Sequence, residues 1–589
     1  MRLPTELPTA PSQLRSLVVR LATPSEQVNP RDSVRALISL YERLQDAALP
    51  INPSVVSLLG LRLAWQLRDI PYHDRARSSV LMTRSGASIF DVMRDEVSCN
   101  LHLYSPPQLV QVVRAFGVAG VRQDLLFRDI VKALQPHICE MTVMQRCHVA
   151  WSYATLDINA RPLFRELVEA TKRTLSLYAP ENLATTMWAY ARLGITDRAV
   201  YQMMLHAAKQ SRGAFDAQAL ANIAWTQAET GVRDCEFLDV IANDLAPLVP
   251  EMSIKALPYV VWSYASLGVA APQLFDAVVG RLSGRIGLLS PLGAAKFLWA
   301  ISRAGIVDED LLAETASHLY DSIGELYGGT LSSVAWAFGN IGYRDDRLFG
   351  ALAERLADNM GTINPSMLVN AIWAFGHVGF RHEGLFREFC GVLEVEKNNL
   401  PAKVYATAVW SIAAVHPEML KGLVERSDLD RLGYDPSGWI QVYNALLIAG
   451  VISPVDTFPA YEKMKQRLMV GAPNSFELDV ERTIRDILAD SSYTIEPQKI
   501  IGGVVTDWYV EVNGKKFAIE CDGKRHHVLL GPDGGVAEGG ERWVAPARDY
   551  AQDKVLRLFG VTPIHVLSST FYACKGDVPT LVSSLRAES

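Results

Sequence analysis

Tryptophan recurs every 37 residues through the middle of the chain, and this spacing constrains the fold more than any other feature of the sequence. Arg114 stands one period before the first tryptophan of the series, and the best later match, at Asn444, comes 34 residues after the last. A fixed period of this length is typical of stacked helical repeats. We count nine units in strict register and one degenerate unit after them. The tryptophans are Trp151, Trp188, Trp225, Trp262, Trp299, Trp336, Trp373 and Trp410.

Three further columns of the alignment predict a helical hairpin in each unit. The residue after the Trp position is always small, which would let neighbouring units approach closely. A Gly follows six residues after the Trp position, as suits a left-handed helix cap, except at Asp157 and His416. Thirteen residues after the Trp position the side chain is always large and apolar. We expect this side chain and the Trp to meet in the core between the two helices.

The pattern as a whole predicts an all-α superhelical solenoid followed by a small α/β domain. Residues 1–100 keep a helical pattern but lose the register, which favours a divergent N-terminal cap. The repeats would occupy residues 101–468, a linker 469–475 and the α/β domain 476–589. No apolar run approaches the roughly 18 to 20 residues needed to span a bilayer, so we expect no membrane partner.

Two columns on the first helix of each unit, the first polar and the second variable, contain the candidate binding residues. The first lies three residues before the Trp position and contains no Asp, Glu or large aliphatic residue; the second lies seven residues later on the same helix face. A row of differing hydrogen-bonding groups, one set per unit, is how helical-repeat proteins address the bases of RNA. The candidate RNA-binding residues are Gln111, His148, Thr185, Asn222, Tyr259, Lys296, Ser333, Asn370 and Thr407 in the first column, and Arg192, Arg303, Asn340 and His377 in the second.

Two other interpretations of these columns stay open. The columns could be a solvated face whose residues vary without constraint, as is common in solenoids. The formal net charge of −7 argues against indiscriminate phosphate binding, because each neutralised phosphate needs a Lys or Arg. It favours a protein-interaction scaffold, or RNA contacts made through bases and sugars.

After the linker the sequence changes to a period of two. Residues 504–523 alternate around Asn513-Gly514, a strong signal for a two-residue hairpin turn in which Val512 faces Lys515. This register places Asp507 opposite Glu520, with side-chain bases about 5 Å apart. The apolar face would then carry Trp508, Val510, Val512, Phe517, Ile519 and Cys521.

Asp522 falls on the same face as this acidic pair, and three such carboxylates repel unless a cation, a proton or basic side chains compensate. Mg²⁺ held by carboxylates on adjacent strands is the arrangement of metal-dependent nucleases. Asp507, Glu520 and Asp522 are therefore candidate catalytic residues, and the first two are candidate metal ligands. We predict no other cofactor. The basic residues that follow, and that could contact phosphate, are Lys524, Arg525, His526 and His527.

The segment from Phe476 to Cys574 resembles the RAP domain, a module abundant in apicomplexan proteins and related to Vsr-like PD-(D/E)XK endonucleases. The resemblance rests on Asp507, on AIECDGKRHH (518–527) and on RDYAQDKVLRLFGVTPIHVL (548–567). The repeats are similar to the heptatricopeptide repeats that accompany RAP domains. The resemblance implies a protein of the mitochondrion, or alternatively the plastid, that binds single-stranded transcripts or ribosomal RNA. It also implies mitochondrial ribosome proteins as possible partners, and no DNA.

The sequence departs from the nuclease relatives at one position that matters for catalysis. They place a Lys two residues after the Glu, where this chain has Asp522; Lys524 or Lys554 could substitute. Three hypotheses therefore remain. The first is an RNA-binding protein that supports RNA stability, processing or ribosome assembly. The second is a Mg-dependent endoribonuclease, and the third is a ribosome-associated scaffold.

Overall fold

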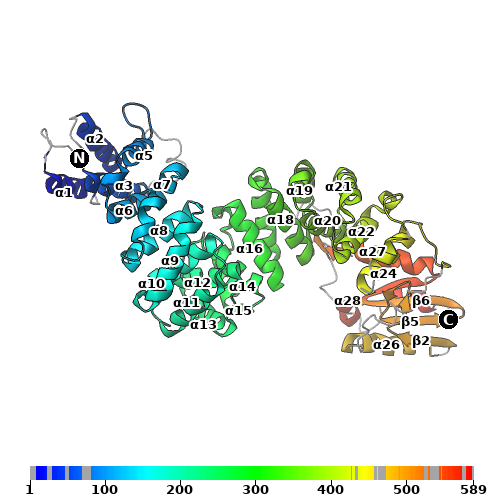
Figure 1. Ribbon diagram of the computed structural model, residues 1–589. Coiled ribbons are helices and arrows are strands. Elements are labelled where there is room, and N and C mark those ends of the chain that lie inside the picture. Colours follow the sequence, from blue (N-terminus) through cyan, green and yellow to red (C-terminus); the bar gives the residue numbers. More distant parts are fainter. Residues whose placement is uncertain are drawn as a thin grey trace. The chain divides into compact units, whose positions relative to one another are not determined.

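The computed structural model describes residues 8, 10–22, 30–46, 52–68, 81–425, 427–431, 436–456, 461, 473–489, 491–522, 528–530, 543–544, 547–573 and 579–586. It divides into two compact units, the first comprising residues 1–252 and 266–277 and the second residues 253–265 and 278–589. Both are built from helical hairpins, and the second ends in a β-sheet with its own helices (Figure 1). No helix in the described ranges is long and apolar enough to cross a membrane.

Within the described residues, the first unit begins with four helices and continues with four hairpins. The early helices are α1 (Pro11–Leu21), α2 (Pro30–Asp46), α3 (Pro53–Arg68) and α5 (Ile89–Cys99). The hairpins are α6 (Pro106–Ala119) with α7 (Asp124–Leu134), α8 (Val143–Thr155) with α9 (Arg161–Thr174), α10 (Pro180–Arg192) with α11 (Arg198–Gln210), and α12 (Ala217–Thr230) with α13 (Cys235–Leu245).

The next hairpin, α14 (Leu257–Leu267) with α15 (Pro272–Leu282), is divided between the units, and the second unit continues the series. Its hairpins are α16 (Pro291–Ala304) with α17 (Glu309–Asp321), α18 (Gly328–Ile341) with α19 (Asp346–Asp358), and α20 (Pro365–Val378) with α21 (Glu383–Glu396). Then follow α22 (Ala402–Val415), η9 (Pro417–Leu420), α23 (Asp428–Arg431) and α24 (Pro436–Ile448).

The first helices of successive hairpins pack directly on one another within each unit. The residue after the Trp position is buried in all nine units, which confirms that small side chains serve close approach. Two glycines on these first helices mark places where neighbouring helices approach very closely. A Cβ added at Gly339 would lie 2.6 Å from Cβ of Ala374, and one at Gly376 would lie 2.9 Å from the carbonyl oxygen of Ser411.

The prediction that the tryptophans fill the core is wrong. The residue two positions after the Trp takes that place: the ring centroid of Tyr153 lies 4.9 Å from Phe127 and 6.2 Å from Phe164. The Phe164 ring in turn lies 6.0 Å from Tyr190 in the next hairpin. A step of two residues turns about 200° around a helix, so the Trp points away from this core. The tryptophan rings of the series stay half-buried, except that Trp410 is only 9% exposed.

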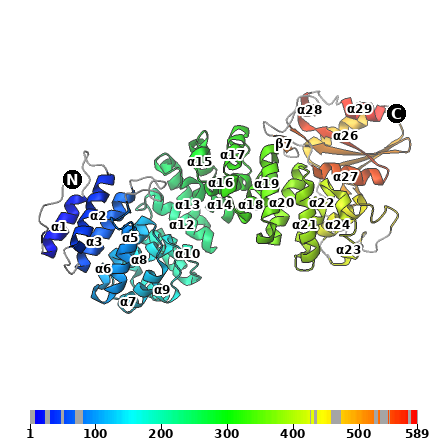
Figure 2. The ribbon, with the colours of Figure 1, turned by 90° about the horizontal axis from the view of Figure 1, so that it is seen from above.

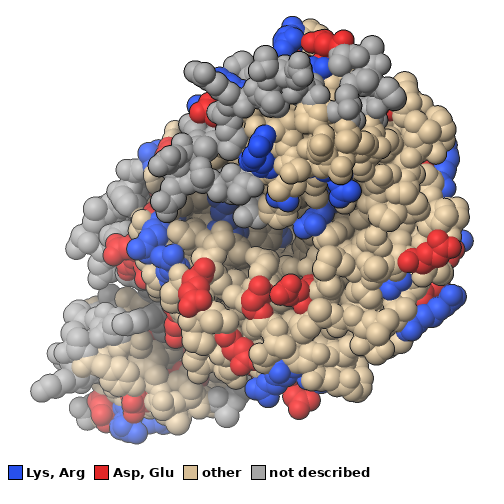
Figure 3. All heavy atoms as spheres, turned by 90° about the vertical axis from the view of Figure 1, so that its left-hand side faces the viewer, with Lys and Arg blue, Asp and Glu red and all other residues tan. Residues whose placement is uncertain are grey.

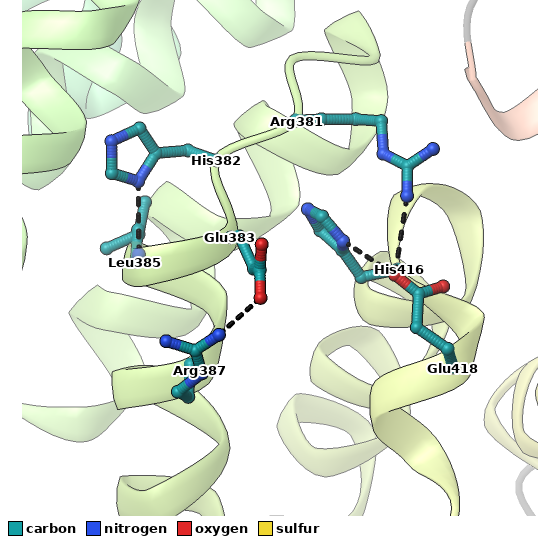
Figure 4. Close-up of polar contacts among 7 residues, drawn as sticks. All are labelled: Arg381, His382, Glu383, Leu385, Arg387, His416 and Glu418. Carbon is teal, nitrogen blue, oxygen red and sulfur yellow. Dashed lines mark hydrogen bonds and ion pairs between the residues drawn. The ribbon is translucent and has the colours of Figure 1, made fainter.

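The glycine column forms left-handed helix ends, as predicted. The seven glycines have φ between 64° and 76°, and Asp157 adopts the same conformation with φ of 54°. His416, with φ of −134°, does not. Its ring packs 4.9 Å from Phe386, and its Nδ1 lies 3.0 Å from Oε1 of Glu418, which also pairs with Arg381 (Figure 4). Side-chain contacts thus form this turn in place of the glycine cap.

The early helices of the first unit already stack in the manner of a repeat. Helix α3 packs on α6, and the guanidinium of Arg114 lies 5.5 Å from the ring centroid of Trp65 in α3. Phe90 of α5 lies 5.3 Å from Phe116, as the large apolar residue of a second helix would. Residues 53–99 therefore behave as an out-of-register hairpin whose connecting loop lies largely outside the described residues.

The C-terminal module contains a four-stranded mixed sheet in the order β2 (Tyr493–Pro497), β5 (Trp508–Val512), β6 (Lys515–Asp522), β9 (Thr562–Leu567). Strands β6 and β9 are parallel and the other pairs antiparallel. The predicted turn and register are confirmed: Val512 pairs with Lys515, and Asn513 and Gly514 have φ of 48° and 79°. Two short antiparallel strand pairs accompany this sheet. They are β3 (Ile500–Ile501) with β4 (Val504–Val505), and β7 (Val528–Leu530) with β8 (Trp543–Val544).

Helices cover both faces of this sheet (Figure 2). On one face α26 (Ser475–Ile487) and α29 (Pro579–Arg586) bury the predicted apolar side chains, while α28 (Ser568–Ala573) adds Phe571. On the other face α27 (Ala547–Leu558) lies between the sheet and the last repeats, packing against α20, α22 and α24. Strand β7 also pairs with β1 (Tyr343–Arg344), which follows α18. The module is therefore anchored to the repeats of its own unit.

Candidate nucleic-acid interface

Both predicted polar columns reach the surface of the first helices. In the first column Asn370 is exposed and the other eight residues are half-buried. In the second column Arg192, Arg303 and Asn340 are exposed, and His377 is half-buried. These side chains therefore lie at least partly at the surface of the protein.

The tryptophans lie on this same surface, which sequence reasoning missed. The ammonium of Lys296 lies 3.8 Å from the ring centroid of Trp262 in the preceding hairpin. The guanidinium of Arg303 lies 5.8 Å from the Trp299 ring, and His377 stacks on Trp373 at 5.0 Å and 12°. The spacing in the sequence could have predicted this position. The Trp lies three residues after the first column and four before the second, so all three lie on the same side of a helix.

Neighbouring tryptophan rings also approach one another. Trp188 and Trp225 lie 6.3 Å apart at 44° in the first unit, and Trp299 and Trp336 lie 6.2 Å apart at 37° in the second. We call this surface, made of the Trp column and the two polar columns, the first-helix face. It presents a repeated aromatic ring flanked by groups that differ from unit to unit.

Part of the hydrogen-bonding capacity of the first-helix face is already used within the protein. Asn340 donates to the carbonyl and hydroxyl oxygens of Ser302 at 3.1 and 3.0 Å, and Asn222 accepts from Gln218 at 3.1 Å. Burial, with the nearby Arg114 charge, lowers the pKa of His148 to about 4. His148 is therefore neutral at physiological pH and offers hydrogen bonds in place of charge.

Charged side chains of both signs lie on the face drawn in Figure 3, with large uncharged areas between them. Near the turn of His416, a cavity of about 390 Å³ is lined by Arg381, Arg387, Glu383 and Glu418. Arg381 pairs with Glu418 and Arg387 with Glu383, so its charges compensate each other (Figure 4).

The predicted carboxylates of the C-terminal module do come together, around a cavity of about 200 Å³. Asp507 Oδ2 accepts a hydrogen bond from the backbone N–H of Cys521 at 2.7 Å. Asp522 Oδ2 lies 2.7 Å from Nδ1 of His565, whose Nε2 lies 3.0 Å from Oδ1 of Asp553. His565 was not predicted, and only the fold could bring it here, because it lies on β9, 43 residues after Asp522.

Protonation compensates the acidic charge in this cavity. Burial, together with the Asp507 charge, raises the pKa of Glu520 well above its usual range. Burial opposes a charged His565, yet its hydrogen bonds to Asp522 and Asp553 raise its pKa to about 10. Burial and the Asp507 charge therefore favour the protonated form of Glu520, and at neutral pH His565 is an imidazolium between two carboxylates. Within the described residues, Oε1 of Glu520 is buried without a hydrogen-bond partner.

The arrangement gives the magnesium hypothesis no support. Among the described residues, no group of three or more His, Cys, Asp and Glu side chains could hold a metal ion. Lys554, a possible substitute for the nuclease lysine, donates at 3.2 Å to the carbonyl oxygen of Ile448 at the end of α24. The predicted phosphate-contacting residues Lys524, Arg525, His526 and His527 lie outside the described residues.

Fold and surface together define a class, the helical-repeat solenoids with a patterned first-helix face. Residues 79–383 match the family model of the RNA-editing substrate-binding complex 6 protein. The match covers just over half of the 589 residues, and the chain belongs to this family. Comparison with curated proteins finds no match. The family match ends before the C-terminal module, so the likeness of that module to a RAP domain remains a prediction.

Proposed function

We propose that the chain binds single-stranded RNA along its first-helix face, as part of an assembly that edits or otherwise processes RNA. One observation carries the proposal: two polar columns and a row of aromatic rings stand together on the surface of successive first helices. The name of the family, which refers to an RNA-editing substrate-binding complex, agrees with it. Unpaired RNA is the ligand that such a surface suits, because its bases are open to stacking and hydrogen bonding.

The mixed surface charge shapes the expected mode of binding. A chain with a net charge of −7 and scattered cations gains little from indiscriminate phosphate contacts. We therefore attribute most of the affinity to bases, and a smaller part to residues such as Lys296 and Arg303. Duplex RNA hides its bases and should bind poorly.

For the C-terminal module we propose a non-catalytic role as a clamp of RAP type. The described lining of its carboxylate cavity contains no Lys or Arg, and Lys554 is engaged at the end of α24. The His565 imidazolium already pairs with Asp522 and Asp553, and burial favours the protonated form of Glu520, one of the acids that a nuclease would use to hold a cation. The endoribonuclease hypothesis is the second candidate, favoured by the buried and unpartnered Oε1 of Glu520.

We place the protein in the mitochondrion, with the plastid as the alternative. Arg2, Arg15 and Arg20, with several Ser and Thr and Glu6 as the only acid among the first 25 residues, resemble a transit peptide. Immunolabelling beside mitochondrial and plastid markers tests this. Label on the plastid marker, or on neither organelle, would overturn the mitochondrial placement.

Fluorescence anisotropy with an unstructured 30-nucleotide RNA tests the binding function. The full chain should bind the single strand at least about tenfold more tightly than the same RNA annealed to its complement, given the stacking energy per base. Absence of RNA binding would leave the scaffold hypothesis, with a protein partner on the same surface.

The nuclease alternative needs a separate assay. RNA incubated with the chain and Mg²⁺ should stay intact, and Asp507→Asn and Glu520→Gln should behave as the wild type does. Cleavage by the wild type that both variants lose would assign the cavity to catalysis and contradict the clamp.

A further inference from the structure

The second unit contains a cavity of about 360 Å³ on its first-helix face. Its lining includes Trp262, Lys296, Trp299, Ser333 and Met367, from four successive first helices. The volume lies within the range of about 300–1,000 Å³ that is typical of small-molecule sites. Such sites are mostly apolar with a few polar groups, which is also the composition here.

We propose that the half-exposed tryptophans are stacking platforms for unpaired nucleobases, and that the cavity between Trp262 and Trp299 seats one base. This inference rests on the RNA binding proposed above and adds where and how the bases are held. Every base has a π-face, so stacking on a tryptophan tolerates any sequence. The variable polar columns can then add preference at individual units.

Charge argues for a nucleotide in this cavity. Although the chain carries a net charge of −7, the described lining of the cavity contains one Lys and neither Asp nor Glu. The Lys296 ammonium lies over the Trp262 ring at 3.8 Å. A base that stacks on this face displaces the ammonium, which can then meet the phosphate of that nucleotide. An anionic ligand with a flat aromatic part satisfies both features at once.

Ser333 supplies a further polar group in the lining of the cavity. The Ser333 hydroxyl donates at 2.9 Å to the carbonyl oxygen of Gly329, so the lone pairs of its oxygen face outward as acceptors. They suit an amino or imino N–H on the edge of a base. A Cβ added at Gly329, which also lines the cavity, would lie 3.2 Å from Cε of Met367.

A purely structural role does not explain the tryptophans. The core between the two helices of a hairpin is filled by the residue two positions later, such as Phe338, which is fully buried. Trp299 and Trp336 instead approach each other at 6.2 Å on the surface and extend the row beyond the cavity. Aromatic rings that remain half-exposed in unit after unit, beside cations, are the pattern of single-strand binding channels.

The test compares two probes with the same backbone charge. One is an unstructured 12-nucleotide RNA, and the other is an abasic oligomer of equal length. Wild-type chain should bind the base-bearing probe far more tightly and show quenched tryptophan fluorescence. Trp262→Ala and Trp299→Ala should each weaken base-bearing RNA by about 5- to 150-fold, the value of one lost stacking contact, and leave abasic binding unchanged.

Matched variants keep the test independent of folding. Trp262→Phe and Trp299→Phe retain a ring and should recover most of the affinity, while Tyr327→Ala removes an aromatic side chain that is 79% exposed and outside the cavity lining. Tyr327→Ala should bind as the wild type does. Thermal unfolding of every variant verifies that the repeats remain folded.

The possible outcomes separate the inference from the function on which it rests. If the wild type binds neither probe, RNA binding itself fails. If the wild type binds RNA but the alanine variants bind it equally well, or lose both probes to the same extent, the stacking seat is overturned while RNA binding stands. Loss of a protein partner with unchanged RNA affinity would likewise overturn it.

Discussion

The first-helix face of the repeats and the carboxylate cavity of the C-terminal module deal with polar groups in opposite ways. On the first-helix face, Lys296, Arg303 and Asn370 stay at the surface beside aromatic rings. In the cavity, Asp522 and Asp553 are paired with the imidazolium of His565, and burial favours the protonated form of Glu520. Side chains on the first-helix face can therefore interact with a ligand, whereas the side chains of the cavity interact mainly with one another.

This contrast locates the expected function. An acidic cluster suggests catalysis when the sequence is considered alone, yet its side chains contact one another and the backbone. The repeated surface shows no cluster in the sequence, but it gathers one tryptophan ring and two column residues in each repeat from Trp151 to Trp373. Four predictions test the contrast, in order of decreasing effect.

The largest effect should come from the true core of the hairpins. Tyr190 is 1% exposed, and its hydroxyl lies 2.8 Å from Oγ1 of Thr171. Tyr190→Ala should lower the free energy of unfolding by about 3–5 kcal/mol, because it empties a packed site. Trp188→Ala, two residues earlier on the half-exposed side, should cost clearly less. Thermal denaturation followed by circular dichroism measures both.

Tyr190→Phe is the control for this comparison, since it keeps the ring and should lose only about 1 kcal/mol with the hydrogen bond. An equal loss of stability in Trp188→Ala and Tyr190→Ala would restore the tryptophans to the core and remove them from the binding surface.

The second effect is a pH dependence set by His565. Its folded pKa of about 10 exceeds the ordinary value of 6.5. The stabilisation of the folded state by the charged His565 is therefore complete below pH 6.5, and it is lost as the pH rises through about 10. His565→Gln should cost about 1.5–3 kcal/mol at neutral pH, as for a hydrogen bond to a charged group, and should flatten this pH profile.

Glu520→Gln serves as the matched control, because burial and the Asp507 charge favour the protonated carboxyl, which a neutral amide of similar shape replaces. Its melting temperature at neutral pH should stay near that of the wild type. A strong destabilisation would mean that Glu520 is ionised, which would reopen the question of a bound cation.

The third effect concerns salt. If Lys296 and Arg303 each contact one phosphate, the double variant Lys296→Ala, Arg303→Ala should reduce the slope of log affinity against log salt by about 0.7 for each lost contact with a single strand. Anisotropy titrations at four or more salt concentrations give the slope. An unchanged slope would mean that Lys296 and Arg303 contact only the tryptophan rings and no phosphate.

The smallest effect should be on base preference. Asn370 is exposed, so Asn370→Ser should change the preferred base at one RNA position by about 2- to 10-fold, the value of one hydrogen bond or slightly more. Selection from a randomised RNA pool shows the change. The same substitution at Asn222 should do less, because Gln218 already donates to its side chain. A uniform loss across positions would indicate backbone contact instead.

The sequence predicted what depends on spacing. The period of 37, the glycine caps and the Asn513-Gly514 turn each follow from local backbone preferences that a neighbouring residue cannot override. The side on which the tryptophans lie did not follow, because Trp and the residue two positions later are both large and apolar in most units. Only packing decided that the second of them, such as Tyr153 or Phe338, is the buried one.

The candidate site in the C-terminal module shows a different limit. The pairing of β5 and β6 was predictable because the two strands are joined by two residues, and it correctly brought Asp507 near Glu520. His565 and Asp553 are contributed by β9 and α27, and nothing in their spacing indicates that they converge on Asp522. The engagement of Lys554 with α24 depends on how the module docks on the repeats.

The docking of α27 has one further consequence. Because α27 packs against α20, α22 and α24, and Trp410 in α22 is only 9% exposed, the accessible rings of the second unit stop at Trp373. The row of partly exposed tryptophan rings in the second unit thus ends within the repeats that carry the C-terminal module.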